Sequence, residues 1–173
     1  METQYKTLFL ISPDGIKESI SLKAGLRSEL IKMMLEINPD SNEIPLDIKN
    51  DILKKIKEYL EHYENEEPIE IERPLPSSNF KECVNEWDYN FIDLDTDMIF
   101  DLMLASNKMD IKSLLELSSA KIAADIKGKN TEEIRKQFNI SNDFTPEEAN
   151  YTSDILYSVN GVLPIPMLIM MMQ

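Results

Sequence analysis

Hydrophobic and polar residues alternate in two short stretches near the N-terminus. Residues 6–12 (KTLFLIS) are rich in strand-forming side chains, and residues 16–22 alternate again after the tripeptide Pro-Asp-Gly at 13–15. Alternation that is interrupted by turn-forming residues is typical of a β-hairpin. Residues 43–46 have the composition of a third short strand. The N-terminal pattern therefore predicts a small sheet.

Apolar residues recur at helical spacing in two further segments. The first begins at Ser28 and ends at Asn38, because a residue that precedes proline disfavours helical backbone. The second runs from residue 51 to residue 63. Its apolar stripe consists of Ile52, Leu53, Ile56, Tyr59, Leu60 and Tyr63. We expect this second helix to pack on the hairpin.

Residues 64–85 interrupt the helical pattern. Acidic residues, three prolines and two serines dominate the stretch ENEEPIEIERPLPSSNFK. Such a composition buries too little apolar surface to offset the entropy lost on ordering. The segment is predicted to be a mobile loop.

Helical spacing returns after Trp87. Thr96 is predicted to cap one helix and Asp110 the next, which Gly128 ends. The apolar positions of these helices are Met98, Ile99, Leu102 and Met103 in the first, and Ile111, Leu114, Leu115, Ile122 and Ile126 in the second.

Two short helices are predicted after Gly128. Asn130 with Glu133 fits a capping box, and Thr145 with Glu148 fits another, with proline at the favoured first helical position. Elements this short cannot cover their own apolar residues, so the core or a partner must do so. These residues are Ile134, Phe138, Ile140 and Phe144.

Composition narrows the function classes. The formal net charge of −14 disfavours binding to nucleic acid, which requires basic clusters. A single cysteine and an N-terminus without a basic region followed by an apolar one are typical of a protein of the cytoplasm or nucleus. The apolar run at 162–172 is too short to span a bilayer, so we expect no membrane association.

Little in the chain suits catalysis, a cofactor or a metal. Cys83 and His62 are the only cysteine and histidine, and no glycine-rich phosphate loop is present. We expect no catalytic residue; the alternative is a cysteine-based hydrolase that uses this pair. The aspartates at 93, 95 and 97 resemble the start of a calcium loop, but Met98 and Leu104 occupy its essential glycine and glutamate positions. No metal or cofactor is predicted.

Residues 87–115 (WDYNFIDLDTDMIFDLMLASNKMDIKSLL) and 126–148 (IKGKNTEEIRKQFNISNDFTPEE) resemble the S-phase-kinase-associated protein family, the adaptor subunits of SCF ubiquitin ligases. The resemblance covers roughly residues 5–150. It implies an α+β fold, a BTB/POZ module of a small sheet flanked by helices, with a C-terminal helical extension that binds F-box proteins. The implied parts are 5–63 (sheet and helices), 64–85 (acidic loop), 86–128 (remaining BTB/POZ helices), 129–150 (F-box-binding helices) and 151–173 (a divergent apolar tail).

The function implied by the resemblance is that of a bridge without catalysis of its own. Members of the family connect F-box substrate receptors to a cullin scaffold for ubiquitin-dependent protein degradation, and so reach the RING subunit and the E2 indirectly. The free protein is expected to form a homodimer. The alternative is an F-box partner in a cullin-independent assembly, of the kinetochore or elongin kind.

Site residues follow from the matched motifs. Asn107 and Lys108 match the cullin side, where lysine replaces an aromatic residue of the family's AANYLDIK pattern, so docking is expected to be weakened or retuned. The resemblance also makes Pro146 a candidate for hydroxylation, although capping alone explains a proline there. The alternative for each apolar receptor-binding position is that it only packs the core. The F-box-binding positions are Leu115, Ile122, Ile126, Ile134, Phe138, Asn139, Ile140, Asn142, Asp143 and Phe144.

The tail after Asn150 departs from the family. A charged helix that closes over the F-box is expected there, but the chain reads YTSDILYSVNGVLPIPMLIMMMQ, in which Pro164 and Pro166 would interrupt a helix. An exposed apolar tail of this kind is expected to self-associate.

Overall fold

A small mixed sheet forms one side of the N-terminal part of the chain. The computed structural model describes residues 6–138. Strand β1 (Thr7–Ile11) pairs antiparallel with β2 (Lys17–Ser21) and parallel with β3 (Glu43–Pro45), which gives the order β2-β1-β3. At the predicted turn, Gly15 has a φ of 79°, a left-handed backbone angle that is unfavourable for residues with a side chain. The hairpin and the third strand are confirmed.

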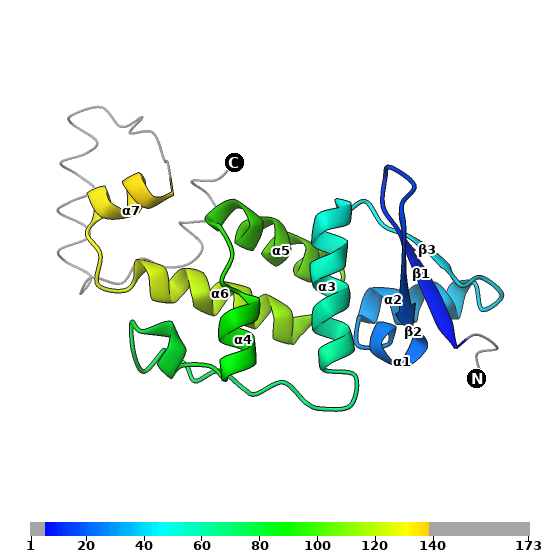
Figure 1. Cartoon of the computed structure of the whole chain (residues 1–173), viewed down its shortest axis with the longest axis horizontal. Coiled ribbons are helices and arrows are strands. Elements are labelled where there is room, and N and C mark those ends of the chain that lie inside the picture. The colour runs from blue at the N-terminus through cyan, green and yellow to red at the C-terminus, as the bar shows by residue number, and fades with distance from the viewer. Residues whose placement is uncertain (1–5, 139–173) are drawn as a thin grey trace. The chain divides into compact units, whose positions relative to one another are not determined.

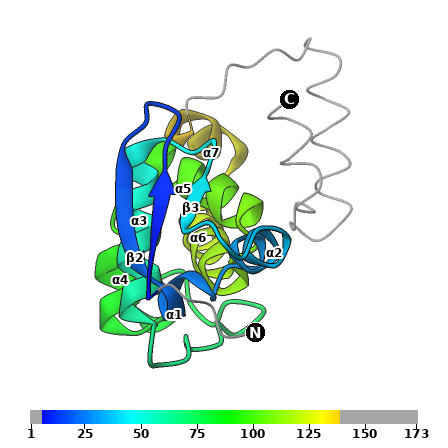
Figure 2. The same ribbon diagram turned by 90° about the vertical axis from the view of Figure 1, so that its right-hand side faces the viewer.

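Two helices lie between β2 and β3 in the sequence, and a third follows β3. Helix α1 (Leu22–Gly25) follows β2 directly and was not predicted, because four residues are too few to show a helical period. Helix α2 (Glu29–Ile37) is capped by Ser28 and ends before Asn38, as predicted. Helix α3 (Asn50–His62) contacts β2, which confirms that it packs on the hairpin (Figure 2).

Helix α3 lies between the sheet and a second pair of helices (Figure 1). This pair consists of α5 (Thr96–Lys108) and α6 (Lys112–Ile126), which pack against each other more extensively than any other two helices within residues 6–138. The sheet, helix α3 and the pair of α5 and α6 all contribute side chains that are almost completely buried. They include Leu8, Leu10 and Ile20 of the sheet, Leu53, Ile56 and Leu60 of α3, and Leu102 and Leu114 of α5 and α6.

Two predicted helix starts are wrong by one residue. Asp95, not Thr96, caps α5, because its side chain accepts the hydrogen bond from the amide of Met98. Asp110 does not cap α6; the N-cap is Ile111, which has no side-chain acceptor. Asp110 instead has a φ of 49°, a left-handed conformation that aspartate tolerates better than most residues. Gly128, with a φ of 82°, follows the end of α6 as predicted.

The acidic segment 64–85 contains more structure than its composition suggests. It includes a 3-10 turn, η1 (Phe80–Glu82), and the side chains of Ile71 and Phe80 are buried. Helix α4 (Glu86–Phe91) begins directly after the segment. Two apolar anchors thus hold parts of this segment against the fold, and its mobility stays a prediction.

The chain divides after Lys129 into two compact units, residues 1–129 and 130–173. The described part of the second unit is α7 (Thr131–Gln137) with its flanking residues. The predicted capping box is confirmed: the Asn130 side chain accepts from the Glu133 amide at 2.9 Å, and the Glu133 carboxylate accepts from the Asn130 amide at 2.8 Å. The predicted cap at Thr145 and Glu148 and the tail 151–173 lie outside the described residues.

Candidate interaction surfaces

The predicted scaffold-binding positions lie at the C-terminal end of α5. Asn107 and Lys108 are both exposed. The Lys108 ammonium donates to the backbone oxygen of Asp47 at 2.9 Å and to its carboxylate at 3.0 Å. Lysine at this position therefore has an acidic partner within its own chain. Sequence reasoning missed Asp47, which precedes Lys108 by 61 residues.

The predicted receptor-binding positions on α6 differ in exposure. Ile122 is buried, with 6% of its surface exposed, whereas Leu115 and Ile126 are half-buried. A buried side chain has little surface left for a partner, so Ile122 fits the alternative of a core residue. Leu115 and Ile126 keep part of their surface for contact.

The predicted receptor-binding positions on and after α7 are described only in part. Ile134 is buried and Phe138 is half-buried. The remaining positions lie outside the described residues, as does Pro146. They are Asn139, Ile140, Asn142, Asp143 and Phe144.

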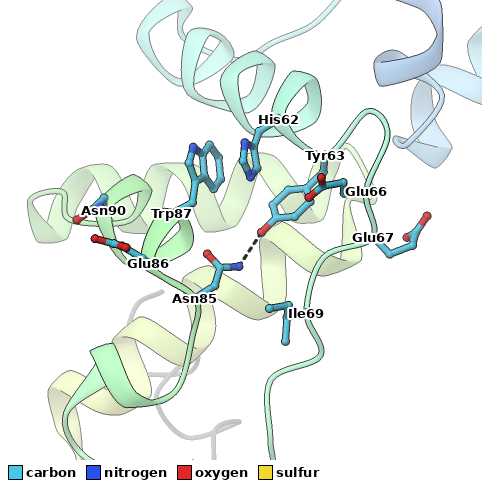
Figure 3. A pocket seen from close by; sticks show the side chains of 9 residues that line it. All are labelled: His62, Tyr63, Glu66, Glu67, Ile69, Asn85, Glu86, Trp87 and Asn90. Atoms are coloured by element: carbon cyan, nitrogen blue, oxygen red, sulfur yellow. Dashed lines mark hydrogen bonds between the residues drawn. The ribbon is translucent and has the colours of Figure 1, made fainter.

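A groove is present where α3 ends and α4 begins (Figure 3), with a cavity volume of about 580 Å³. The ring of His62 stacks on the ring of Trp87, with ring centres 3.5 Å apart and planes nearly parallel. Three glutamates, at 66, 67 and 86, also line the groove. No cysteine, serine or threonine side chain lines this groove.

A buried polar network lies beside this groove. The hydroxyl of Tyr63 donates to one carboxylate oxygen of Asp88 at 2.8 Å, and the Asn85 side-chain amide donates to the other at 2.7 Å. Burial raises the pKa of Asp88, against the opposing effect of these hydrogen bonds. Burial also raises the pKa of Tyr63 to about 12, so its phenol stays protonated at neutral pH. Sequence reasoning missed this network, although Asn85 with Asp88 three residues later matches a helix N-cap spacing.

The two residues of the hydrolase alternative have separate environments. The Cys83 thiol donates to the backbone oxygens of Ser77 and Asn79, at 3.4 and 3.7 Å. The ring of His62 contacts the rings of Tyr63 and Trp87 instead. Within residues 6–138, no interaction joins Cys83 to His62.

Among the described residues, no group of three or more histidine, cysteine, aspartate or glutamate side chains could hold a metal ion. No helix within residues 6–138 is long and apolar enough to cross a membrane.

The described residues form an α+β fold, with a three-stranded sheet and helices. Comparison with known proteins identifies the family. The Skp1 family, dimerisation domain, matches residues 112–150. An S-phase kinase-associated protein 1 homolog of Tetrahymena thermophila is 50% identical over 141 residues, which are 80% of this chain and 85% of the relative.

Fungal relatives match a similar length. The E3 ubiquitin ligase complex SCF subunit sconC of Arthroderma benhamiae is 42% identical over 148 residues, which are 84% of this chain and 90% of the relative. The protein of the same name from Aspergillus fumigatus is 42% identical over 144 residues, which are 82% of this chain and 90% of the relative. This chain belongs to the Skp1 family, and the predicted α+β fold and family are confirmed.

Proposed function

We propose that this chain is the adaptor subunit of an SCF-type E3 ubiquitin ligase, which bridges an F-box substrate receptor to a cullin scaffold. The observation that carries the proposal is the similarity to relatives named as SCF subunits, which extends over 84% of this chain in the case of Arthroderma benhamiae. Because the first compact unit has 129 residues, a match of 148 residues also reaches into the second unit.

The proposed mechanism is geometric and requires no catalytic group in this subunit. A bridge that holds receptor and scaffold at once converts the meeting of substrate and ubiquitin-charged E2 into an intramolecular event with a high effective concentration. The RING subunit and the E2 are reached through the scaffold. Turnover then takes place on other subunits, in the cytoplasm and nucleus.

Two segments are proposed to contact the receptor: α6 in the first unit, and the segment that begins with α7 in the second. Leu115 and Ile126 offer half-buried apolar surface on α6, and Phe138 offers an aromatic ring that is also half-buried. Aromatic side chains with partial exposure are typical anchors of an interface. The proposed scaffold site includes Asn107 and Lys108, at the C-terminal end of α5.

The direct test is reconstitution. The purified chain is mixed with an F-box domain and a cullin N-terminal domain, separately and together, and complexes are followed by size-exclusion chromatography with light scattering. We expect a stable ternary complex. Binding to neither domain would refute the adaptor function, and binding to the F-box domain alone would favour a cullin-independent assembly.

A substitution of the residue that follows α7 tests the receptor site. Phe138→Ala is expected to weaken F-box binding by at least about tenfold, because it removes an aromatic anchor, while cullin binding stays unchanged. Lys136→Ala, at an exposed position of α7 two residues earlier, is the matched control and is expected to bind normally. Equal affinities for the two variants would remove Phe138 from the receptor site.

Cys83→Ser separates an adaptor from a cysteine-based hydrolase. The adaptor predicts normal receptor and scaffold binding by this variant and no hydrolytic activity that depends on the thiol. Hydrolysis by the wild-type chain that is lost in Cys83→Ser would overturn the non-catalytic assignment.

The free chain is expected to self-associate through its receptor surface. Sizing at increasing protein concentration, with and without an F-box domain, tests this directly. The receptor should dissociate the dimer.

A further inference from the structure

One face of α5 exposes a large apolar side chain between two ion pairs. Leu104 keeps 63% of its surface exposed. Asp101 lies three residues before it and Lys108 four residues after it, which places all three side chains along one face of the helix. The apolar residue therefore has charged neighbours on both sides along the helix axis.

Both charged neighbours bind the segment that precedes α3. Lys108 is bound by Asp47, as described above, and Asp101 accepts a hydrogen bond from the Lys49 ammonium at 2.7 Å. This contact raises the pKa of Lys49. Both pairs are largely exposed to solvent, and such pairs add little to folding stability. An apolar centre with a charged rim is the usual composition of a protein interface.

The ion pair between Lys108 and Asp47 lowers the net charge that a partner would cover at this surface. A lone lysine at the centre of an interface would lose its hydration without compensation when a partner covers it. Here the ammonium already has two acceptors on Asp47, so the partner covers a paired group with little net charge. Leu104 supplies apolar surface one turn away.

We propose that Leu104 is the apolar anchor for the cullin scaffold in this chain, and that Asp47 is a positioning residue that neutralises and orients Lys108 within the same surface. The inference rests on the proposed adaptor function. The occupant follows from continuity, because this face includes Lys108 and adjoins Asn107, the two positions assigned to scaffold docking. Lys108 stands where the family pattern has an aromatic residue, and in this surface it is paired with Asp47 beside the exposed Leu104.

A double-mutant cycle on Asp47 and Lys108 tests the positioning role. The full-length chain is titrated with a cullin N-terminal domain by isothermal calorimetry, and with an F-box domain as a second readout. Asp47→Ala should weaken cullin binding by about 30-fold or more, since it removes the carboxylate that neutralises the covered lysine and leaves only the backbone acceptor. Adding Lys108→Met to Asp47→Ala should restore most of this loss, because methionine needs no charged partner. F-box binding should not change in either variant.

Matched controls distinguish this role from a general charge effect. Glu58→Ala removes the acid of another exposed ion pair, between Lys55 and Glu58 at 2.9 Å, and should leave cullin affinity unchanged. If Asp47→Ala binds cullin as Glu58→Ala does, or if Lys108→Met fails to rescue it, the positioning role is overturned. A wild-type chain that does not bind cullin overturns both this inference and the proposed bridge.

The anchor role has its own comparison. Leu104→Ala should weaken cullin binding by about tenfold or more, whereas Ile69→Ala, at a position with a similar exposed fraction of 61%, should not. Equal affinities of these two variants would overturn the assignment of Leu104.

Discussion

The hydroxyl of Tyr63 donates a hydrogen bond to the carboxylate of Asp88 at 2.8 Å, across the acidic segment that separates them in the sequence. The same hydroxyl accepts a hydrogen bond from the side-chain amide of Asn85 at 3.1 Å. Tyr63 is the residue after α3, and Asp88 lies in the first turn of α4. This contact therefore closes the acidic segment at its two ends and joins two helices.

Removal of this hydroxyl should destabilise the fold. Tyr63→Phe leaves a carboxylate that is 5% exposed with one donor fewer, and the free energy of unfolding should fall by about 1–3 kcal/mol. Urea unfolding followed by the fluorescence of Trp87, the only tryptophan, measures the change. The control is Tyr89→Phe, at a half-buried position of α4. Its free energy of unfolding should stay within about 0.5 kcal/mol of the wild-type value. Equal stability of the two variants would contradict the role of this contact.

The buried carboxyl of Asp88 should make stability depend on pH. Because burial raises its pKa above the ordinary 3.8, the folded chain holds the proton to a higher pH than the unfolded chain does. Its contribution to stability is thus greatest in acid and falls as pH rises from 3.8 through the raised value. Asp88→Asn cannot titrate, so the stability of the wild type relative to this variant should decrease between about pH 3 and pH 7. If the stability of the wild type relative to Asp88→Asn instead increased over this pH range, the pKa of Asp88 would be lowered in the folded chain.

A buried serine joins the start of α2 to the end of α5. The Ser28 hydroxyl donates to the backbone oxygen of Met109 at 2.6 Å and accepts from the amide of Ile31 at 3.3 Å. Ser28→Ala removes a helix cap and a buried hydrogen bond together and should cost about 2–3 kcal/mol of unfolding free energy.

Ser118→Ala is the matched control for this prediction. Ser118 is also completely buried, but its hydroxyl only donates to the Leu114 oxygen one turn earlier in the same helix. Its loss should therefore change stability by about 0.5 kcal/mol or less. Thermal unfolding of both variants measures the contrast, and equal losses would show that the contact to Met109 adds nothing.

The capping box of α7 should govern local order in the second unit. Asn130→Ala removes one of the two reciprocal hydrogen bonds and should destabilise this helix by about 1 kcal/mol, since a helix of one or two turns depends on its cap. Hydrogen exchange at residues 131–138 should become several-fold faster, while α3 and α5 should exchange as before. Thr131→Ala keeps both capping groups and serves as the control. Unchanged exchange in Asn130→Ala would contradict the prediction.

Patterns with a short range predicted their elements correctly. The stripe from Ile52 to Tyr63 identified α3, and the turn at 13–15 identified the hairpin, because both signals depend on neighbours within a few residues. The capping box at Asn130 was found for the same reason. Asp95 and Thr96 are adjacent, and either residue type can cap a helix, so the composition did not show which of them caps α5. The backbone path into α5 places Asp95 at the N-cap position.

Contacts between distant segments were not visible in the pattern. The parallel pairing of β1 with β3 joins Leu10 to Ile44, and no local signal selects that register. The left-handed backbone of Asp110 arises where the chain turns between α5 and α6, which pack together. An ion pair such as that of Lys108 with Asp47 needs both segments in place before the two charges meet.

The sequence by itself determined which segments are helices and strands, where most of them end, and the family. It did so because helix and strand periods, caps and turns depend on residues that are close together in the sequence. It also determined that the chain is strongly acidic and contains little material for catalysis. Only the tertiary structure decided that Ile122 is buried while Leu104 is exposed, and that Lys108 and Asp88 have the partners described here. Burial and pairing depend on which surfaces the folded chain brings together, and apolar or charged residues look the same in a sequence whether they face the core or a partner.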